Sequence, residues 1–192
     1  MRAELTGLPH GWFHHGELVL ELIEQLRPQT IVELGTWRGA SAIAMARLAR
    51  TWGGVVYCVD TWMGEVNGGV ESGPPAMLGE VGRNIVAAGV ASSIRLIPAL
   101  TVDAAAWWTG PIDFLWIDAD HTYDAVRADL EAWVPHVRIG GLFAGDDYGH
   151  TLYPGVAQAW DRWADERGQA LSRVPSPQSG LPDMALVYGW QS

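Results

Sequence analysis

Cysteine, basic residues and long apolar runs are scarce in this chain of 192 residues. Its single cysteine, Cys58, excludes an internal disulfide and a thiolate metal cage, and the apolar neighbours of Cys58 indicate a small core residue. No segment approaches the roughly 20 apolar residues that a membrane helix needs, and the N-terminus has no run long enough for a signal peptide. We therefore expect a cytoplasmic protein with no membrane partner.

Lysine and arginine number 12 against 22 acidic residues, which gives a formal net charge of −10. Nucleic acids and anionic membranes attract basic surfaces, so this balance disfavours both as partners and leaves small molecules or proteins. Apolar residues make up 48% of the chain and charged residues 18%, enough for one full core. We expect residues 1–192 to form a single domain, with residues 1–27 as an N-terminal helical segment.

Short apolar runs alternate with segments of helical periodicity, which is the pattern of a parallel sheet covered by helices. Five strands are predicted, at residues 30–34, 55–60, 94–98, 114–118 and 142–146. Helices are predicted at residues 18–26, 40–52, 77–88, 123–133 and 156–167. After a Pro- and Ser-rich turn, residues 184–190 read as a last strand, paired with residues 171–174 as a hairpin. The expected fold class is α/β, with a doubly wound, mostly parallel sheet and a C-terminal antiparallel hairpin.

Ligands of such sheets gather at the carboxyl ends of the strands, so the residues that close each strand are the first candidates for a site. The first strand ends in ELGTWRGAS, where Gly35 and Gly39 bracket a turn that lets a ligand approach backbone N–H groups at the next helix. This spacing differs from the G-x-G-x-x-G of dinucleotide sites, and a turn that needs glycine for its geometry alone is the alternative. Asp60 follows about 20 residues later, the separation at which an acidic residue binds ribose hydroxyls. A lone strand-end Asp is usually a cap, so Asp60 is informative only together with the glycine turn.

Three carboxylates close the fourth and fifth predicted strands: Asp118, Asp146 and Asp147. Like charges at one rim repel, and a cation relieves that repulsion most simply. Oxygen ligands suit Mg²⁺ or another hard divalent cation. The alternative is that Asp118 and Asp120 cap the following helix and that residues 146–147 belong to a loop. His121 lies beside this group and can accept a proton at neutral pH, although a lone histidine is more often a surface residue.

The stretch VELGTWRGASAIAMARLA resembles the first motif of class I S-adenosyl-L-methionine-dependent methyltransferases, and of catechol O-methyltransferases in particular. The stretch FLWIDADHTYDAVRADLEAWVPHVRIGGLFAGDDYG is similar to the second half of small bacterial O-methyltransferases, including the macrocin and mycinamicin sugar enzymes and cephalosporin-hydroxylase-like proteins. The resemblance runs from about Gly11 to Trp163. It implies a single-domain Rossmann-like methyltransferase fold with S-adenosyl-L-methionine as cofactor.

The resemblance also implies roles for individual residues. The cofactor would be bound by Glu33, Gly35, Thr36, Trp37, Gly39, Ser41, Asp60, Thr61, Trp62, Leu100, Thr101 and Asp118. Within this set, Asp60 would take the ribose hydroxyls, and Leu100 and Thr101 would lie along the adenine. Asp118, Asp146 and Asp147 would hold Mg²⁺, and His121 would be the catalytic base. Catechol enzymes usually have lysine in place of His121 and asparagine in place of Asp147, which favours the sugar-type branch.

The resulting prediction is metal-assisted O-methylation of a small-molecule hydroxyl on a vicinal diol, sugar or catechol-like acceptor. A metal-independent or N-directed methyltransferase and a non-catalytic cofactor-binding protein remain alternatives. Residues 64–76 form either a lid over the substrate or a disordered crossover. His150 is a candidate substrate contact, whereas surface roles are the commoner expectation for His14 and His15. A homodimer that completes the acceptor pocket is also considered.

Overall fold

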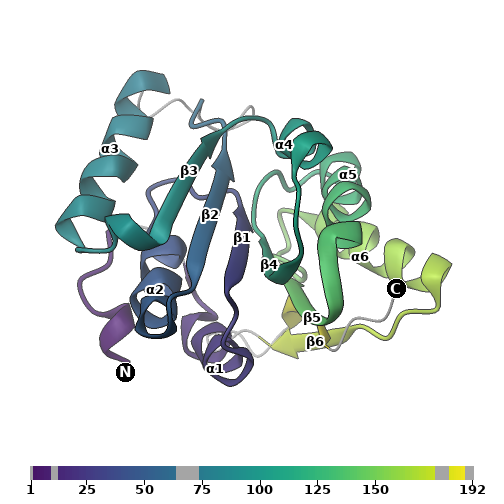
Figure 1. Cartoon of the computed structure of the whole chain (residues 1–192). Coiled ribbons are helices and arrows are strands. Elements are labelled where there is room, and N and C mark those ends of the chain that lie inside the picture. Colours follow the sequence, from purple (N-terminus) through teal and green to yellow (C-terminus); the bar gives the residue numbers. More distant parts are fainter. Residues whose placement is uncertain (1, 10–12, 64–73, 176–181, 189–192) are drawn as a thin grey trace.

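A computed structural model describes residues 2–9, 13–63, 74–175 and 182–188 (Figure 1). Within these residues one sheet of seven strands has the order β3-β2-β1-β4-β5-β7-β6. The strands are β1 Thr30–Leu34, β2 Val55–Asp60, β3 Ile94–Pro98, β4 Ile112–Ile117, β5 Val137–Gly145, β6 Ser172–Pro175 and β7 Pro182–Tyr188. Strands β1 to β5 pair in parallel, and β7 pairs antiparallel with both β5 and β6. The predicted fold class is confirmed, including the C-terminal hairpin.

Helices cover both faces of the sheet (Figure 1). On one face pack α1 Gly16–Leu26, α2 Ala40–Ala49 and α3 Pro74–Ala87, and on the other pack α4 Thr101–Trp107, α5 Tyr123–Trp133 and α6 Pro154–Arg167. Short 3-10 turns lie at Ala3–Leu5, Arg50–Trp52, Ala91–Ser93 and Val134–His136. Among the described residues, every helix is too short or too polar to span a bilayer.

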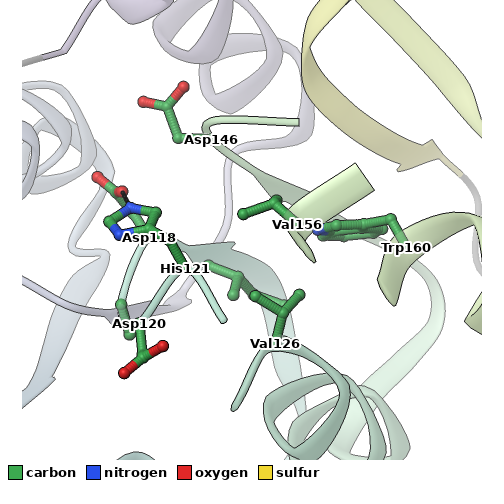
Figure 2. A pocket seen from close by; sticks show the side chains of 9 residues that line it. Asp118, Asp120, His121, Val126, Asp146, Val156 and Trp160 are labelled. Carbon is green, nitrogen blue, oxygen red and sulfur yellow. Dashed lines mark ion pairs between the residues drawn. The ribbon is translucent and has the colours of Figure 1, made fainter. Parts of the chain in front are cut away.

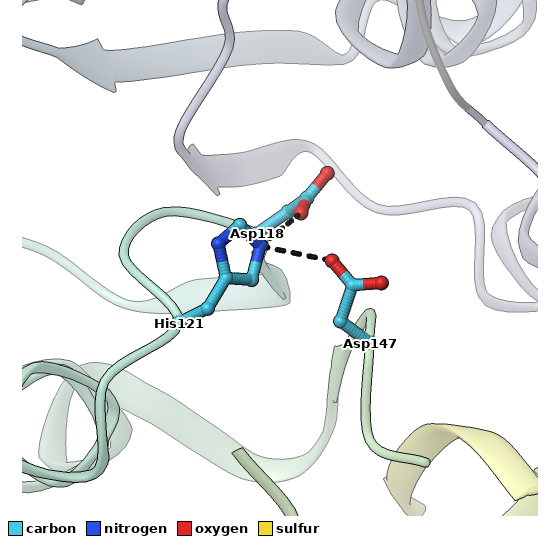
Figure 3. A group of neighbouring side chains, drawn as sticks. All are labelled: Asp118, His121 and Asp147. Atoms are coloured by element: carbon cyan, nitrogen blue, oxygen red, sulfur yellow. Dashed lines mark ion pairs between the residues drawn. The ribbon is translucent and has the colours of Figure 1, made fainter. Parts of the chain in front are cut away.

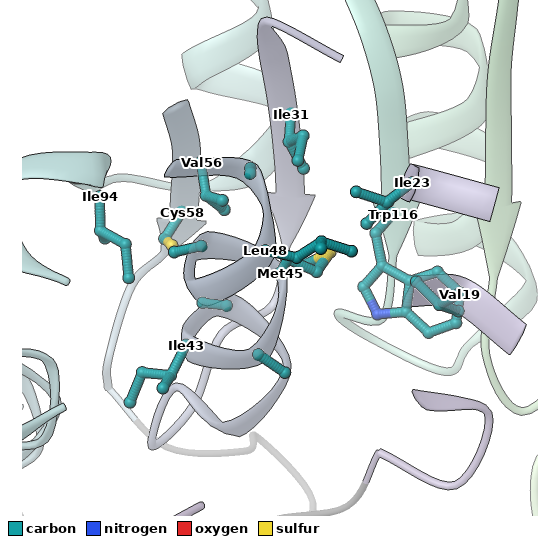
Figure 4. Packing of buried hydrophobic residues seen from close by; sticks show 14 of the residues in the cluster. Val19, Ile23, Ile31, Ile43, Met45, Leu48, Val56, Cys58, Ile94 and Trp116 are labelled. Carbon is teal, nitrogen blue, oxygen red and sulfur yellow. The ribbon is translucent and has the colours of Figure 1, made fainter. Parts of the chain in front are cut away.

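Alternate residues of each central strand enter opposite cores, because successive side chains of a strand point to opposite faces. In β4, Phe114 and Trp116 pack toward α1 and α2, while Leu115 and Ile117 pack toward α5 and α6. Figure 4 shows Trp116 in the first of these cores, together with Cys58 of β2, which is fully buried as predicted. A sheet buried on both faces explains why its strands are continuous apolar runs.

Several predicted boundaries differ from those of the structure. Strand β4 ends at Ile117, one residue before Asp118, and β5 begins at Val137, five residues earlier than expected. Helix α4 was not predicted at all. Of the predicted lid, residues 64–73 lie outside the described residues, and residues 74–76 begin α3.

Candidate functional site

The carboxyl ends of β2, β1, β4 and β5 lie side by side, because these strands are consecutive in the sheet. Gly35 follows β1 and passes so close to β4 that a Cβ atom there would lie 2.0 Å from the carbonyl oxygen of Asp118. Among the described non-glycine residues with positive φ, three lie at this rim: Trp37 at 45°, Trp62 at 49° and Asp147 at 57°. Such conformations cost energy and persist only where the surroundings enforce them, which is common at functional sites.

Glu33 is hydrogen-bonded to two residues that follow β1, Thr36 and Ser41. Its side chain is fully buried and accepts hydrogen bonds from the hydroxyls of Ser41 and of Thr36, the latter at 2.7 Å. Burial raises the pKa of Glu33 to about 7, although the two hydroxyl hydrogen bonds act in the opposite direction. Glu33 therefore holds the side chains of Thr36 and Ser41 in place.

Asp60 joins two strand-end loops through its carboxylate. Oδ2 accepts the backbone N–H groups of Thr36 and Trp37, each at 2.8 Å, and Oδ1 accepts that of Trp62 at 2.7 Å. The indole of Trp62 donates in turn to the carbonyl of Trp37 at 2.9 Å. A carboxylate offers about four acceptor positions, so at most one remains for a ribose hydroxyl.

The predicted adenine segment adjoins Asp60. The N–H of Ala99 donates to the carbonyl oxygen of Asp60 at 3.1 Å, and the next residue, Leu100, is 57% exposed. Thr101 is the first residue of α4. Thr61, also in the predicted cofactor set, accepts the N–H of Met63 through its hydroxyl at 3.2 Å.

Asp118, His121 and Asp147 meet at the rim (Figure 3), and one ligand atom from each lies within 4.8 Å of the others. His121 Nε2 is 2.9 Å from Oδ2 of Asp147 and 3.8 Å from Oδ1 of Asp118. Burial lowers the pKa of His121, but the carboxylates of Asp118 and Asp147 outweigh it and raise the pKa to about 10. Burial raises the pKa of Asp118 to about 6, against the effect of His121. Two carboxylates and an imidazole at these distances suit a divalent cation.

Asp146 is not part of this group of three. Its Oδ1 accepts the N–H of Asp147 at 3.0 Å and lies 4.0 Å from Nε2 of His15, and both side chains are buried. Figure 2 shows the Asp146 carboxylate apart from that of Asp118. The structure thus brings two of the three predicted metal ligands together with His121. No spacing in the sequence distinguishes buried His15 from exposed His14.

Asp120 and Thr122, in the loop after β4, form hydrogen bonds within the loop and with the first turn of α5. Thr122 caps α5 by accepting the N–H of Ala125 at 3.4 Å, and exposed Asp120 accepts the N–H of Thr122 at 2.7 Å. The residue that caps α5 is therefore Thr122 and not Asp118.

Aromatic rings flank the cluster. The ring of Tyr153 stacks with that of His121 at a centroid distance of 4.3 Å and with that of His150 at 4.8 Å. A small cavity opens beside His121 (Figure 2). Its lining residues are Ile117, Asp118, Ala119, Asp120, His121, Val126, Asp146, Val156 and Trp160.

Comparisons with known proteins agree with this architecture. Residues 32–148 match the family described as the methyltransferase domain. The uncharacterized protein y4gI of Sinorhizobium fredii (strain NBRC 101917 / NGR234) is 32% identical in an alignment 137 residues long, which covers 66% of this chain and 14% of that protein. The chain thus spans only a small part of the length of this relative.

Solved structures share the fold. Cofactor-bound Rv0187 from MTB aligns with a TM-score of 0.76 at 18% identity, covering 97% of this chain and 85% of that one. The O-methyltransferase from Bacillus cereus in complex with SAH aligns with a TM-score of 0.71 at 19% identity, with the same coverage of 97% and 85%. The chain belongs to the methyltransferase-domain family, and its fold is that of S-adenosylmethionine-dependent O-methyltransferases. The resemblance to methyltransferases noted in the sequence is confirmed.

Proposed function

We propose that this chain catalyses O-methylation of a small-molecule hydroxyl, with S-adenosylmethionine as methyl donor and a divalent cation such as Mg²⁺ at the rim. The observation that carries the proposal is the meeting of Asp118, His121 and Asp147 beside the loops that Asp60 joins. The same proposal includes a vicinal diol, sugar or catechol-like acceptor, a cytoplasmic location and self-association.

The chemistry needs two reactants held in line and a hydroxyl that loses its proton. When bound, the cofactor would supply an electrophilic methyl group, and a divalent cation would lower the pKa of the acceptor hydroxyl. Asp118 and Asp147 would hold the cation. Asp60 and Glu33 keep the cofactor loops in place through the hydrogen bonds described above. Positioning by these residues supplies much of the rate.

His121 has two proposed roles that use the same atom. With a pKa of about 10 its imidazole is protonated at neutral pH and lies between the two carboxylates, where it already offsets their charge. A cation bound there would lower this pKa and free Nε2 either to take the acceptor proton or to bind the cation. A nitrogen that binds the cation has no lone pair left for a proton.

The His121→Ala variant separates these roles. If His121 is the base, kcat should fall by about 10²-fold or more while the affinity for Mn²⁺, measured by calorimetry, stays within a few fold. If His121 is a ligand, the Mn²⁺ affinity itself should fall. An unchanged rate with unchanged Mn²⁺ affinity would remove His121 from the mechanism.

The proposal as a whole is tested with Asp118→Asn and Asp147→Asn. Both should abolish Mg²⁺-dependent release of S-adenosylhomocysteine with a panel of catechols and sugar diols, because each removes an anionic ligand. The affinity of Asp147→Asn for S-adenosylhomocysteine should stay within a few fold of the original, because Asp147 lies outside the predicted cofactor set. Asp124→Asn, an exposed change on α5, is the matched control. Loss of cofactor binding in both site variants would contradict the proposed metal role.

A metal-independent methyltransferase is the second candidate. The observation in its favour is that protonated His121 already offsets one of the two negative charges of Asp118 and Asp147. Turnover that survives EDTA, with Asp147→Asn still active, would select this candidate over the first.

A further inference from the structure

A second cavity lies on the face of the sheet that α4 covers, toward the amino ends of the strands. Helix α4 has seven residues and spans about 10 Å, whereas the five residues of β3 span about 16 Å. The helix therefore leaves the amino-terminal part of this face to residues 107–111, which lead into β4. A cavity of about 390 Å³ lies there, and Tyr57, Arg95 and Ile97 of the sheet line it together with residues 107–111.

Two aromatic side chains form a fixed part of this cavity. The ring of Trp108 meets that of Tyr57 edge-on, with 5.0 Å between the centroids. Trp108 also packs against Trp133 of α5 at a centroid distance of 5.6 Å, and its Nε1 donates to the carbonyl oxygen of Gly110 at 3.0 Å. Because contacts within the chain hold Trp108 in place, a ligand would pay little for ordering this part of the cavity.

Trp107 presents a further aromatic surface at the cavity. Its side chain is 56% exposed, whereas that of its neighbour Trp108 is half-buried. Single exposed apolar residues are common and need no explanation by themselves. Trp107, however, lies in a cavity that two other aromatic rings already line. Ligand pockets are lined in this way, by apolar and aromatic side chains with a few polar groups that fix orientation.

Arg95 supplies the polar group. It pairs directly with Tyr57 across β2 and β3, so both side chains lie on the same face of the sheet. Its Nη1 donates to the carbonyl oxygens of Ser92 at 3.0 Å and of Ile94 at 2.9 Å. Within the described part of the chain, Nε and Nη2 have no hydrogen-bond partner and the guanidinium pairs with no carboxylate. Those two atoms carry three further N–H donors.

The charge of the cavity contrasts with that of the chain. Acidic residues outnumber basic ones by 22 to 12, yet Arg95 is the one charged residue among the described residues that line the cavity. A cationic group with free donors beside aromatic rings favours a ligand that is both flat and negatively charged. The guanidinium matches a carboxylate especially well, because its planar fork can donate to both oxygens.

We propose that this cavity is a second ligand site, which binds a small planar aromatic carboxylate. The ring packs against Trp107 and Tyr57, and the carboxylate accepts hydrogen bonds from Arg95. The volume lies within the range of about 300–1,000 Å³ that is typical of ligand pockets. Tyr57 precedes Asp60 by three residues, or about 10 Å along β2, so the site is separate from the candidate cofactor site. It does not depend on the proposed function.

The test uses 2-naphthoate as the probe and two matched compounds. 2-Naphthamide keeps the rings without the charge, and decahydro-2-naphthoate keeps the charge without aromatic rings. We expect 2-naphthoate to bind with a Kd of about 1 mM or tighter and the other two to bind about tenfold more weakly. In an NMR titration the amide signals of Thr109 and Gly110 should shift, and those of Gly35 and Gly39 should not. Saturating S-adenosylhomocysteine should change the affinity by less than about twofold.

Two variants with matched controls assign the contacts. Arg95→Met should weaken 2-naphthoate by about tenfold and leave 2-naphthamide unchanged, because it removes the charge and keeps an apolar stem. Trp107→Ala should weaken both compounds by about tenfold. Arg83→Met and Val86→Ala are the controls, because both residues are exposed on α3, on the other face of the sheet. Thermal melting checks folding, and Trp107→Ala decides alone if Arg95→Met does not fold.

Four results would overturn the proposal. They are unshifted Thr109 and Gly110 signals at about 10 mM 2-naphthoate, equal binding of the saturated compound, competition by S-adenosylhomocysteine, and unchanged affinity in Trp107→Ala. Sedimentation of the original chain and of Trp107→Ala tests a different occupant. A dimer that Trp107→Ala converts to a monomer would show that a second copy of the chain covers the cavity, and it would also overturn the proposal.

Discussion

Asp60 illustrates how a single residue limits what the site can recognise. Its Oδ2 accepts two backbone N–H groups and its Oδ1 accepts a third, so a single position on Oδ1 is left for a ribose hydroxyl. We predict that one of the 2′-deoxy and 3′-deoxy forms of S-adenosylhomocysteine binds within about twofold of the parent compound. The other should bind about tenfold more weakly. Calorimetry with the three ligands measures this, and equal losses for the two deoxy forms would mean that Asp60 binds both hydroxyls.

Some residues of the candidate site can be predicted from the sequence, and others cannot. Asp60, Asp118 and Asp147 follow directly from the rule that parallel strands end at one rim. The orientation of Asp146 does not follow, because Asp146 and Asp147 are consecutive and Asp147 adopts a left-handed conformation that no sequence pattern specifies. The contact between Asp146 and His15 joins residues 131 positions apart, and neither residue carries a signal for the other.

At the level of elements, the close approach of the β1 turn to β4 depends on Gly35. Gly35 has a φ of 80°, and a Cβ atom there would overlap the Asp118 carbonyl. Gly53 has nearly the same φ, 84°, but no neighbour within 4 Å, so it isolates the backbone cost alone. We predict that Gly53→Ala lowers the free energy of unfolding by roughly 1 kcal/mol and that Gly35→Ala lowers it by about 3 kcal/mol or more.

Urea denaturation of both variants measures the difference. Similar costs for the two substitutions would show that the ends of β1 and β4 separate easily. In that case the close packing of the rim would not be a condition for the fold.

Predictability differs among the elements for physical reasons. Helix α5 was predicted with its observed bounds, because Val126, Leu130 and Trp133 keep one face apolar, whereas its cap, Thr122, was not predicted. Helix α4 was missed because it has only seven residues and begins after Leu100, which gives no capping signal. The early part of β5 is broken by Gly140 and Gly141, and its pairing with β4 shifts register between Ile112 and Phe114. The composition of this segment therefore does not indicate a strand, although the segment pairs with β4 as one.

For the whole molecule, these buried titratable groups all make the folded chain less stable as the pH rises. The pKa values of Glu33 and Asp129 are raised to about 7, that of Asp118 to about 6 and that of His121 to about 10. Each group therefore binds its proton more tightly in the folded chain than in the unfolded chain. The unfolded chain loses these protons first as the pH rises, so stability must fall with pH over this range.

The stabilisation that comes from protonated Glu33 and Asp129 is fully present below about pH 4, where the same carboxyl groups titrate in the unfolded chain. It is lost by about pH 7.5, above the pKa values of these groups in the folded chain. We predict that, in EDTA, the free energy of unfolding from urea denaturation decreases between pH 5 and pH 7.5. The Glu33→Gln/Asp129→Asn variant should show a clearly smaller decrease, because neither replacement titrates. Glu166→Gln is the control: the hydrogen bonds from Arg127 and Arg162 lower the pKa of Glu166, so it stays ionised throughout this window and the slope should not change. An equal slope in the double variant would show that the charges of Glu33 and Asp129 are already relieved in the folded chain, by water or by local opening of the rim.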